Sequence, residues 1–219
     1  VWPVISYGTA IWGFKSFSCI NAVHNRAMRF YLGVGKYTPT AAVAGDMGWL
    51  PADIKQWETI CSYWYRIVKM SNVRTNKSTL VWAFQKANRL CKNWIYIVTE
   101  KFKSLNCEIY CNMFLRFSKE KLKIDVMKAL KDNYILSWEK LVNAEVGQRQ
   151  GHNKLRTYKW FKTNYIVEPY CKIILPLKQR SAFAKFRCGV APLRIETGRY
   201  EQLEVNDRKC PICTQDVET

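Results

Sequence analysis

Acidic side chains are scarce in this chain. It has 17 Asp and Glu against 35 Lys and Arg in 219 residues, which gives a formal net charge of +18. That excess is larger than solubility requires and predicts a polyanionic partner. Long apolar runs are also missing, because no stretch reaches the roughly 18 apolar residues of a membrane span, and no signal-peptide pattern opens the chain. The charge favours a polyanion, either nucleic acid or an anionic membrane, and the missing apolar runs argue against a membrane-spanning role. Of these partners we expect RNA or DNA, and no membrane.

The side-chain combinations typical of enzyme active sites are missing as well. The chain has only two histidines, and its six aspartates stand isolated in the sequence: Asp46, Asp53, Asp125, Asp132, Asp207 and Asp216. Two-metal polymerase chemistry needs carboxylates that are brought close together, and no nucleophile triad or Gly-rich phosphate loop is recognisable. We therefore expect the chain to catalyse nothing by itself.

The nine cysteines are too scattered to form a disulfide framework. An odd count in a chain of this length predicts reduced thiols and an intracellular protein of the cytoplasm, the nucleus or both. Most of these cysteines are expected to be small core residues. Cys107 and Cys111 are four residues apart and would share one face of a helix, where core packing is favoured over metal binding.

Apolar and aromatic residues, at 48% and 14% of the chain, are sufficient for a hydrophobic core. Their spacing predicts a mainly α-helical fold. The clearest amphipathic helix spans residues 52–70 and has an apolar stripe of Ile54, Trp57, Cys61, Trp64 and Val68. Further helices are predicted at 18–32, in a short Ala-rich segment after Thr38-Pro39 that Gly45 and Gly48 end, at 79–90, at 94–105, and at 118–130 with a continuation at 137–144.

Two of these regions leave alternatives open. Residues 94–98 are rich in β-branched and aromatic side chains, so a short buried strand is an alternative there. In the region 118–144, Asp132-Asn133 is expected to interrupt a helix whose inward residues are Leu122, Val126 and Leu130. Residues 71–78 are polar and predict a loop.

A polar, glycine-containing segment at 147–153 predicts a linker between two domains. Residues 1–146 are expected to form a helical bundle, and residues 154–219 a small basic helical module. From Arg149 to Lys209 there are fourteen Lys and Arg against five Asp and Glu, a surplus of nine. This segment therefore holds half of the net charge.

The basic module contains the residues predicted to contact nucleic acid. One segment alternates cations with flat rings, a pattern that suits single strands because bases stack while phosphates are neutralised: Arg156, Tyr158, Lys159, Trp160 and Lys162. Residues 175–187 predict an amphipathic helix with an apolar sector of Leu175, Ala182, Phe183 and Phe186. The helix rims and the following turn add candidate phosphate contacts: Lys178, Arg180, Lys185, Arg187, Arg194 and Arg199. The alternative is an ordinary surface helix with solvated cations, in which Tyr158 and Phe161 pack against the protein.

Cys210-Pro211-Ile212-Cys213 has the spacing of a zinc knuckle, in which two thiolates leave one tight turn and reach one metal ion. A closed structural zinc site needs four ligands, and no His or Cys follows Cys213. The sequence therefore predicts an incomplete site. Three interpretations stay open: the missing ligands lie beyond the end of the chain, or Cys188, Cys171 or His152 complete the site, or no metal binds.

These motifs resemble the C-terminal region of the reverse transcriptases of LINE-type, non-long-terminal-repeat retrotransposons. The resemblance rests on the runs KLRTYKWFK at 154–162, RSAFAKFRCG at 180–189, PLRIETGRY at 192–200 and CPIC at 210–213. At the other end, YGTAIWG at 7–13, LGV at 32–34 and Thr38-Pro39 resemble the segment just after the polymerase palm in the same family. The similarity touches both ends of the chain and is vaguer in the middle.

The resemblance implies a non-catalytic part of such an enzyme, because the paired aspartates of the polymerase palm are absent. Residues 1–146 would correspond to a thumb-like or connecting region, and the implied partners are template RNA or target DNA and the catalytic core of the parent polymerase. In that family a His and a further Cys complete the knuckle, so zinc is expected only if both follow Thr219. A chain that stops inside this motif is expected to be a fragment of a longer one.

Two other functions stay open. The helical part could dock on a polymerase core or a host partner as a protein-interaction scaffold, which an exposed apolar patch around Trp2, Trp12 or Trp49 would favour. The chain could also be a decayed transposon remnant without a selected role. Charge and aromatic content alone support only the binding of a polyanion.

Overall fold

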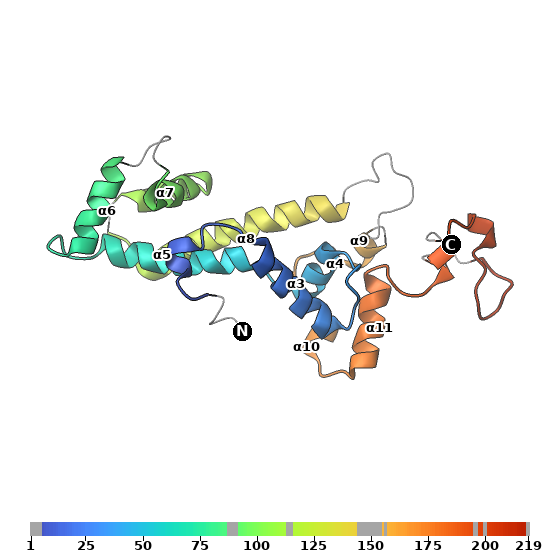
Figure 1. Ribbon diagram of the computed structural model, residues 1–219. Helices are drawn as coiled ribbons and strands as arrows, with labels where there is room; N and C mark the ends of the chain where they lie inside the picture. The colour runs from blue at the N-terminus through green and yellow to red at the C-terminus, as the bar shows by residue number, and fades with distance from the viewer. Residues whose placement is uncertain are drawn as a thin grey trace. The chain divides into compact units, whose positions relative to one another are not determined.

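The protein is described by a computed structural model over residues 6–86, 92–112, 116–143, 155, 157–194, 197–198 and 201–217. These residues are mainly helical, which confirms the predicted fold class (Figure 1). The only β-type pairing among them is an isolated antiparallel bridge between Lys209 and Val217. The predicted linker at 147–153 lies outside the described ranges. None of the described helices is both long and apolar enough to cross a membrane.

Contacts group the chain into two units, each assembled from separate stretches of sequence. The first unit contains Val1–Ala22 and Leu50–Ile135, and the second contains Val23–Trp49 and Leu136–Thr219. The second unit therefore combines residues from before and after the predicted linker. The division into a helical bundle at 1–146 and a basic module at 154–219 stays a prediction.

The helices of the first unit are α2 (Thr9–Trp12), α5 (Ala52–Val68), α6 (Thr75–Lys86), α7 (Trp94–Ser104), the short η1 (Glu108–Cys111) and the first part of α8 (Lys119–Asn143). α5 is the predicted amphipathic helix. Its apolar stripe is buried as predicted: Ile54, Trp57, Cys61, Trp64 and Val68. The three- and four-residue steps of this stripe keep it on one side of the helix, which faces the core of the unit.

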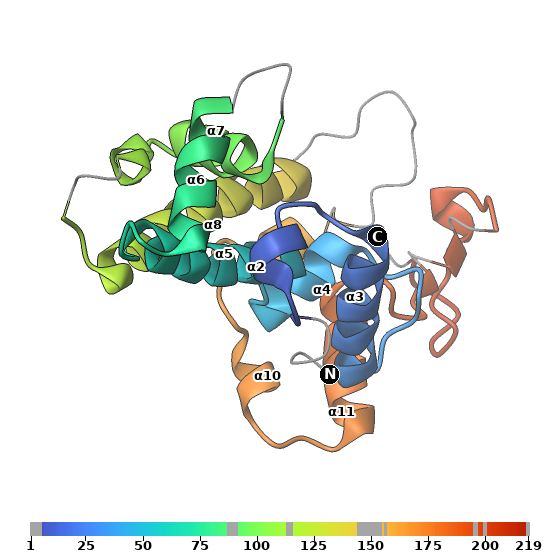
Figure 2. The ribbon, with the colours of Figure 1, turned by 60° about the vertical axis from the view of Figure 1, so that its left-hand side comes forward.

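The core of the first unit forms where α5, α7 and α8 meet. The α5 stripe packs with Val98 and Phe102 of α7 and with Leu122 and Val126 of α8. Figures 1 and 2 show α5 running beside α8, with α6 and α7 packed near one end of the pair. The prediction that Leu122, Val126 and Leu130 face inward is confirmed.

The predicted helix at 94–105 is confirmed as α7, and the alternative of a short strand at 94–98 is not formed, because the Asn93 side chain caps the helix by accepting a hydrogen bond from the Tyr96 amide (2.9 Å). Two other sequence predictions in this unit were wrong. Asp132 and Asn133 do not interrupt α8, since both side chains are exposed and stay solvated within the helix. The predicted loop at 71–78 already enters α6 at Thr75.

The helices of the second unit are the greater part of α3 (Ser18–Leu32), α4 (Thr40–Met47), the end of α8, α9 (Tyr158–Phe161), α10 (Pro169–Lys172), α11 (Leu177–Arg187) and the short η2 (Val205–Asp207). α4 is the predicted Ala-rich helix and ends at Gly48, whose positive φ of 60° favours glycine. Gly45 was also expected to end this helix but lies inside it. A side chain at Gly45 would collide with the Tyr158 hydroxyl and the Trp138 ring.

The face of α11 that packs against the unit is the opposite of the predicted one. Phe183 and Phe186 are exposed, whereas Ser181, Ala184 and Cys188 are buried. Gly33 explains the choice of face: the Ser181 hydroxyl donates to its carbonyl (2.7 Å), and a Cβ atom at Gly33 would lie 2.9 Å from the Ser181 Cβ. Small side chains are needed at so close an approach, so the aromatic rings face outward.

Isoleucine truncation in the first unit distinguishes its core from its surface. Ile60 is fully buried in α5, so we expect Ile60→Ala to lower the free energy of unfolding by about 2–5 kcal/mol. Ile124 on α8 is exposed, and Ile124→Ala serves as the matched control with an expected loss below about 0.5 kcal/mol. Urea denaturation measures both values, and equal losses would contradict the placement of α5.

Candidate nucleic-acid interface

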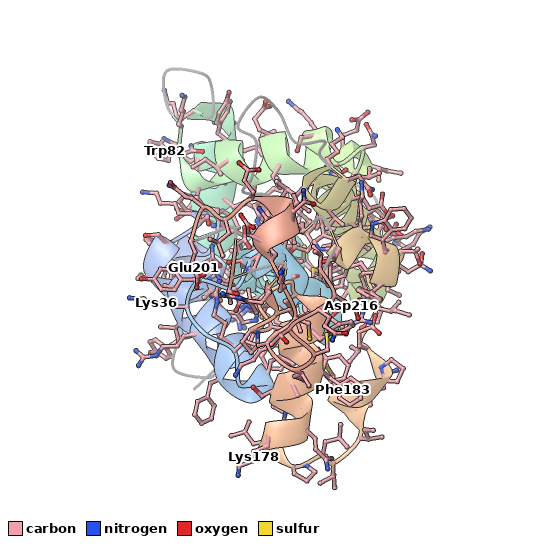
Figure 3. The ribbon with its side chains drawn as sticks, turned by 90° about the vertical axis from the view of Figure 1, so that its right-hand side faces the viewer. Lys36, Trp82, Lys178, Phe183, Glu201 and Asp216 are labelled. Atoms are coloured by element: carbon pink, nitrogen blue, oxygen red, sulfur yellow. The ribbon has the colours of Figure 1, made fainter. Side chains whose placement is uncertain are left out.

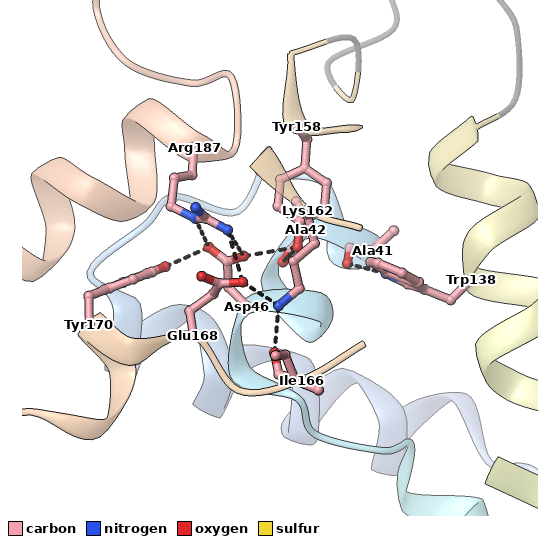
Figure 4. Close-up of polar contacts among 10 residues, drawn as sticks. All are labelled: Ala41, Ala42, Asp46, Trp138, Tyr158, Lys162, Ile166, Glu168, Tyr170 and Arg187. Carbon is pink, nitrogen blue, oxygen red and sulfur yellow. Dashed lines mark hydrogen bonds and ion pairs between the residues drawn. The ribbon is translucent and has the colours of Figure 1, made fainter. Parts of the chain in front are cut away.

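Asp46 on α4 is fully buried and accepts hydrogen bonds from three side chains (Figure 4). The Tyr158 hydroxyl donates to Oδ1 (2.9 Å) and the Tyr170 hydroxyl to Oδ2 (2.7 Å). Arg187 donates from Nε to Oδ2 (3.0 Å) and from Nη2 to Oδ1 (3.2 Å). This bidentate arginine contact is charge-assisted and geometrically specific. One carboxylate therefore joins α4, α9, α10 and α11.

A second carboxylate completes this buried network. Glu168 Oε1 receives Lys162 Nζ (2.5 Å) and Arg187 Nη2 (3.1 Å). Lys162 Nζ also donates to the Ile166 carbonyl (2.5 Å), and the Glu168 amide donates to the Asp46 carbonyl (2.9 Å). Two cations thus face two carboxylates, so the network has no net charge and its charged groups are compensated inside the protein.

The network also raises the pKa values of its two tyrosines and its arginine. Burial, together with the charge of Asp46, raises the pKa of the Tyr158 and Tyr170 phenols, so both hydroxyls stay protonated donors at neutral pH. Burial alone would lower the pKa of Arg187, but the hydrogen bonds and charge of Asp46 outweigh burial and raise it. Arg187 therefore stays cationic.

Three of the predicted nucleic-acid contacts belong to this network. Tyr158 has 0% of its surface exposed and also donates to the Ala42 carbonyl (3.0 Å), so it has no free ring face for a base. Lys162 is buried against Glu168, and Arg187 is engaged by Asp46 and Glu168. We therefore remove Tyr158, Lys162 and Arg187 from the set of contacts and assign them a structural role.

Two further predicted arginines are partly engaged. Arg180 donates from Nε to the Tyr31 carbonyl (2.7 Å), and its guanidinium lies 4.2 Å from the centre of the Tyr31 ring. Arg194 forms an ion pair with Glu201 (2.8 Å). Arg156 and Arg199 lie outside the described residues.

The remaining predicted contacts lie at the surface. Lys159 and Trp160 are exposed on α9, where 77% of the Trp160 surface is accessible and the Lys159 ammonium lies 5.9 Å from a Trp160 ring centre. Lys178 is exposed and Lys185 half-buried on α11. Figure 3 shows Lys178 projecting outward from this helix. In the part of the chain that the structure describes, no ion pair involves these three lysines.

The structure adds exposed rings that the sequence did not assign to the interface. Phe161 of α9 and Phe186 of α11 are both exposed, and their ring centres lie 5.6 Å apart. Phe183, one turn from Phe186, is exposed beside Tyr170 at 6.1 Å (Figure 3). In the sequence, the spacing of the small residues Ser181, Ala184 and Cys188 could have indicated the packed face of α11. Phe183 and Phe186 would then have been expected to point outward.

The predicted knuckle forms one turn but supplies only two sulfur ligands. The Thr214 amide donates to the Cys210 carbonyl (2.8 Å), and the Cys210 amide donates to the Asp216 carbonyl (2.8 Å). Cys210 is half-buried and Cys213 exposed, and backbone hydrogen bonds from Asp216 and Gln215 lower the pKa of the Cys213 thiol. Within the described residues, no three His, Cys, Asp or Glu side chains gather as metal ligands. Two thiols fit half of a structural zinc site.

Two substitutions on α11 distinguish the structural role of Arg187 from the surface role of Lys185. Arg187→Met leaves Asp46 and Glu168 short of a buried counter-charge, so we expect a loss of about 3–5 kcal/mol in the free energy of unfolding. Lys185→Met makes the same change at a cation without a described ion pair and should cost less than about 0.5 kcal/mol. Thermal and urea denaturation measure both, and an unchanged stability in Arg187→Met would refute the structural role of Arg187.

The chain matches no family model, no curated protein and no solved structure.

Proposed function

We propose that the second unit binds a strand of RNA or DNA through the outward faces of α9 and α11. It would do so as a non-catalytic part of a non-long-terminal-repeat retrotransposon reverse transcriptase, holding template RNA or target DNA. The motifs at 154–162 and 180–213 support the second half of this proposal, and the surface supports the first. We call this surface the ring surface and define it by Trp160, Phe161, Phe183 and Phe186.

The observation that carries the proposal is the exposure of the Phe161–Phe186 ring pair within the most basic part of the chain. Exposed apolar side chains that gather in one patch commonly mark an interaction site. Bases stack on such rings whatever the sequence, while nearby ammonium groups neutralise phosphates. Lys159, Lys178 and Lys185 supply those cations on the same two helices.

The carboxylates of this unit support a binding role and not a catalytic one. Asp46 is the fully buried acid near the ring surface, and donors from Tyr158, Tyr170 and Arg187 engage both of its oxygens. The half-buried Glu168 receives Lys162 and Arg187 at Oε1. Carboxylates that hold catalytic metal ions need oxygen lone pairs free for the metal. We therefore include no catalytic step in the proposal, and zinc belongs to it only if the missing ligands follow Thr219.

A second candidate function, a protein-interaction scaffold, is favoured by α3. Val23 and Phe30 lie seven residues apart on one side of this helix and are both exposed, with 86% of the Phe30 surface accessible. Trp49 is also partly exposed. A chain that binds neither RNA nor DNA but pulls down the parent polymerase core would support this role.

Titration of the whole chain with single-stranded RNA, duplex RNA and duplex DNA at several salt concentrations tests the proposal. We expect the single strand to bind most tightly, because only unpaired bases reach the rings, and affinity to fall as salt rises. Weak binding to all three at near-physiological salt would refute nucleic-acid binding and favour the scaffold or remnant interpretation.

Ring and charge variants separate the two parts of the ring surface. Phe161→Leu with Phe186→Leu keeps apolar volume but removes stacking, so affinity for single-stranded RNA should fall about tenfold or more with an unchanged salt slope. Lys159→Met with Lys185→Met should instead lower the slope by about 1.4, since each contact with a single strand contributes about 0.7. Lys209→Met, outside α9 and α11, is the control. Leucine variants that bind as well as the wild type would refute ring stacking.

A further inference from the structure

The first unit contains a pocket at the end of α5 that the proposed function does not use. Its volume is about 650 Å³, within the range of small-molecule sites. The last turn of α5 and one side of α6 form its walls. The residues that line it include Val68, Asn72, Lys77, Ser78, Trp82 and Gln85. All of them belong to the first unit, whereas the residues of the ring surface belong to the second.

Lys77 is the unusual member of this lining. Only 7% of its surface is exposed, and its ammonium donates one hydrogen bond, to the Val68 carbonyl at the end of α5 (2.5 Å). Burial lowers the pKa of Lys77, and the nearby positive charge of Lys69 lowers it further. An ammonium has three protons to donate, and a carbonyl supplies a partial charge where a buried cation needs a full one.

No carboxylate of this region compensates Lys77. The sequence has no Asp or Glu between Glu58 and Glu100, while seven cations fall in that interval: Arg66, Lys69, Arg74, Lys77, Lys86, Arg89 and Lys92. Among the described residues, Lys77 takes part in no ion pair. The pocket therefore presents a positive charge that an incoming anion can neutralise.

Trp82 adds a flat apolar surface to this positively charged pocket. Its indole lines the same pocket, and 61% of its surface is exposed at the outer side of α6 (Figure 3). Asn72, Ser78 and Gln85 add neutral hydrogen-bonding groups. A ligand that combines an anionic group with an aromatic ring matches this lining.

We propose that the pocket binds a mononucleotide, with its phosphate against Lys77 and its base against Trp82. The phosphate supplies the missing negative charge. It also accepts hydrogen bonds from the ammonium N–H groups that do not bond to the Val68 carbonyl. The base covers an indole that is otherwise in water, and the neutral polar side chains contact its edge or the ribose.

Isothermal titration of the whole chain with AMP, inorganic phosphate and adenosine tests the pairing of charge and ring. We expect AMP to bind about tenfold or more tightly than either of the other two, because only AMP uses both groups. Trp82→Leu should reduce AMP binding to the level of inorganic phosphate and leave phosphate binding unchanged. No AMP binding at millimolar concentration, or equal affinity for adenosine and AMP, would overturn the proposal.

Two charge variants test the role of Lys77 and guard against loss of folding. Lys77→Met should weaken AMP binding about tenfold or more, and far-UV circular dichroism checks that the helices persist. Gln85→Glu changes an exposed side chain, adds a negative charge to the lining and should weaken AMP binding about fivefold even if Lys77→Met does not fold. An unchanged affinity in Gln85→Glu would overturn the proposal.

The control must match the change in net charge, because a chain of +18 attracts any anion weakly. Lys86→Gln lowers the net charge by one, as Gln85→Glu does, at a neighbouring residue outside the pocket lining. It should leave AMP affinity within about twofold of the wild type. The double variant Lys159→Met with Lys185→Met should do the same. A loss in Lys86→Gln equal to that in Gln85→Glu would indicate unspecific attraction and refute a defined site.

Discussion

The second unit depends on one buried charge, the carboxylate of Asp46. A carboxylate without water needs a full counter-charge and several donors, or it costs several kcal/mol. Asp46 obtains them from Tyr158, Tyr170 and Arg187, which lie on three short elements far along the chain. Because α9 and α10 have only four residues each, their own backbone hydrogen bonds cannot hold them in place. The shared carboxylate does, together with the small apolar core around Met28 and Ala184.

The surface proposed to bind nucleic acid is a consequence of that constraint. Arg187 on α11 and Tyr158 on α9 must both reach Asp46, so the two helices meet with their other sides outward. Phe161 and Phe186 lie on those sides and come into ring contact there. The residues that build the surface are thus different from the residues that would touch a ligand, although both kinds are cationic or aromatic.

Helical periodicity in the sequence correctly predicted the buried faces of α5 and α8. The α5 stripe and the inward leucines of α8 follow from helical periodicity against a continuous apolar neighbour. The face of α11 did not follow, because its partners are Gly33, Tyr31 and Asp46, about 140 to 150 residues earlier in the chain. Apolarity favoured the side with Phe183 and Phe186, whereas close packing against Gly33 requires small side chains.

The same limit applies to charge. Counting treats every cation of the basic segment alike, but Lys162 and Arg187 are neutralised internally and Arg194 is paired with Glu201. Among the predicted contacts on α9 and α11, Lys159, Lys178 and Lys185 take part in no ion pair within the described residues. The cations of α9 and α11 that can reach a partner are therefore fewer than the cations that these helices contain. An interface with few cations gains little from phosphates alone, so the exposed rings must contribute much of any affinity.

Two buried lysines differ in whether a carboxylate of the protein compensates their charge, and this difference distinguishes a structural role from a binding role. Lys162 has a carboxylate and a carbonyl within 2.5 Å, and its charge is balanced inside the protein. Lys77 is nearly as buried, but among the described residues its ammonium bonds to the Val68 carbonyl alone. It lies in a stretch of sequence without acids and at the wall of a pocket. The first lysine gains nothing from an added anion, since a phosphate would have to displace Glu168. Within the described residues no carboxylate pairs with the second, so we expect a bound anion at Lys77 to stabilise the fold.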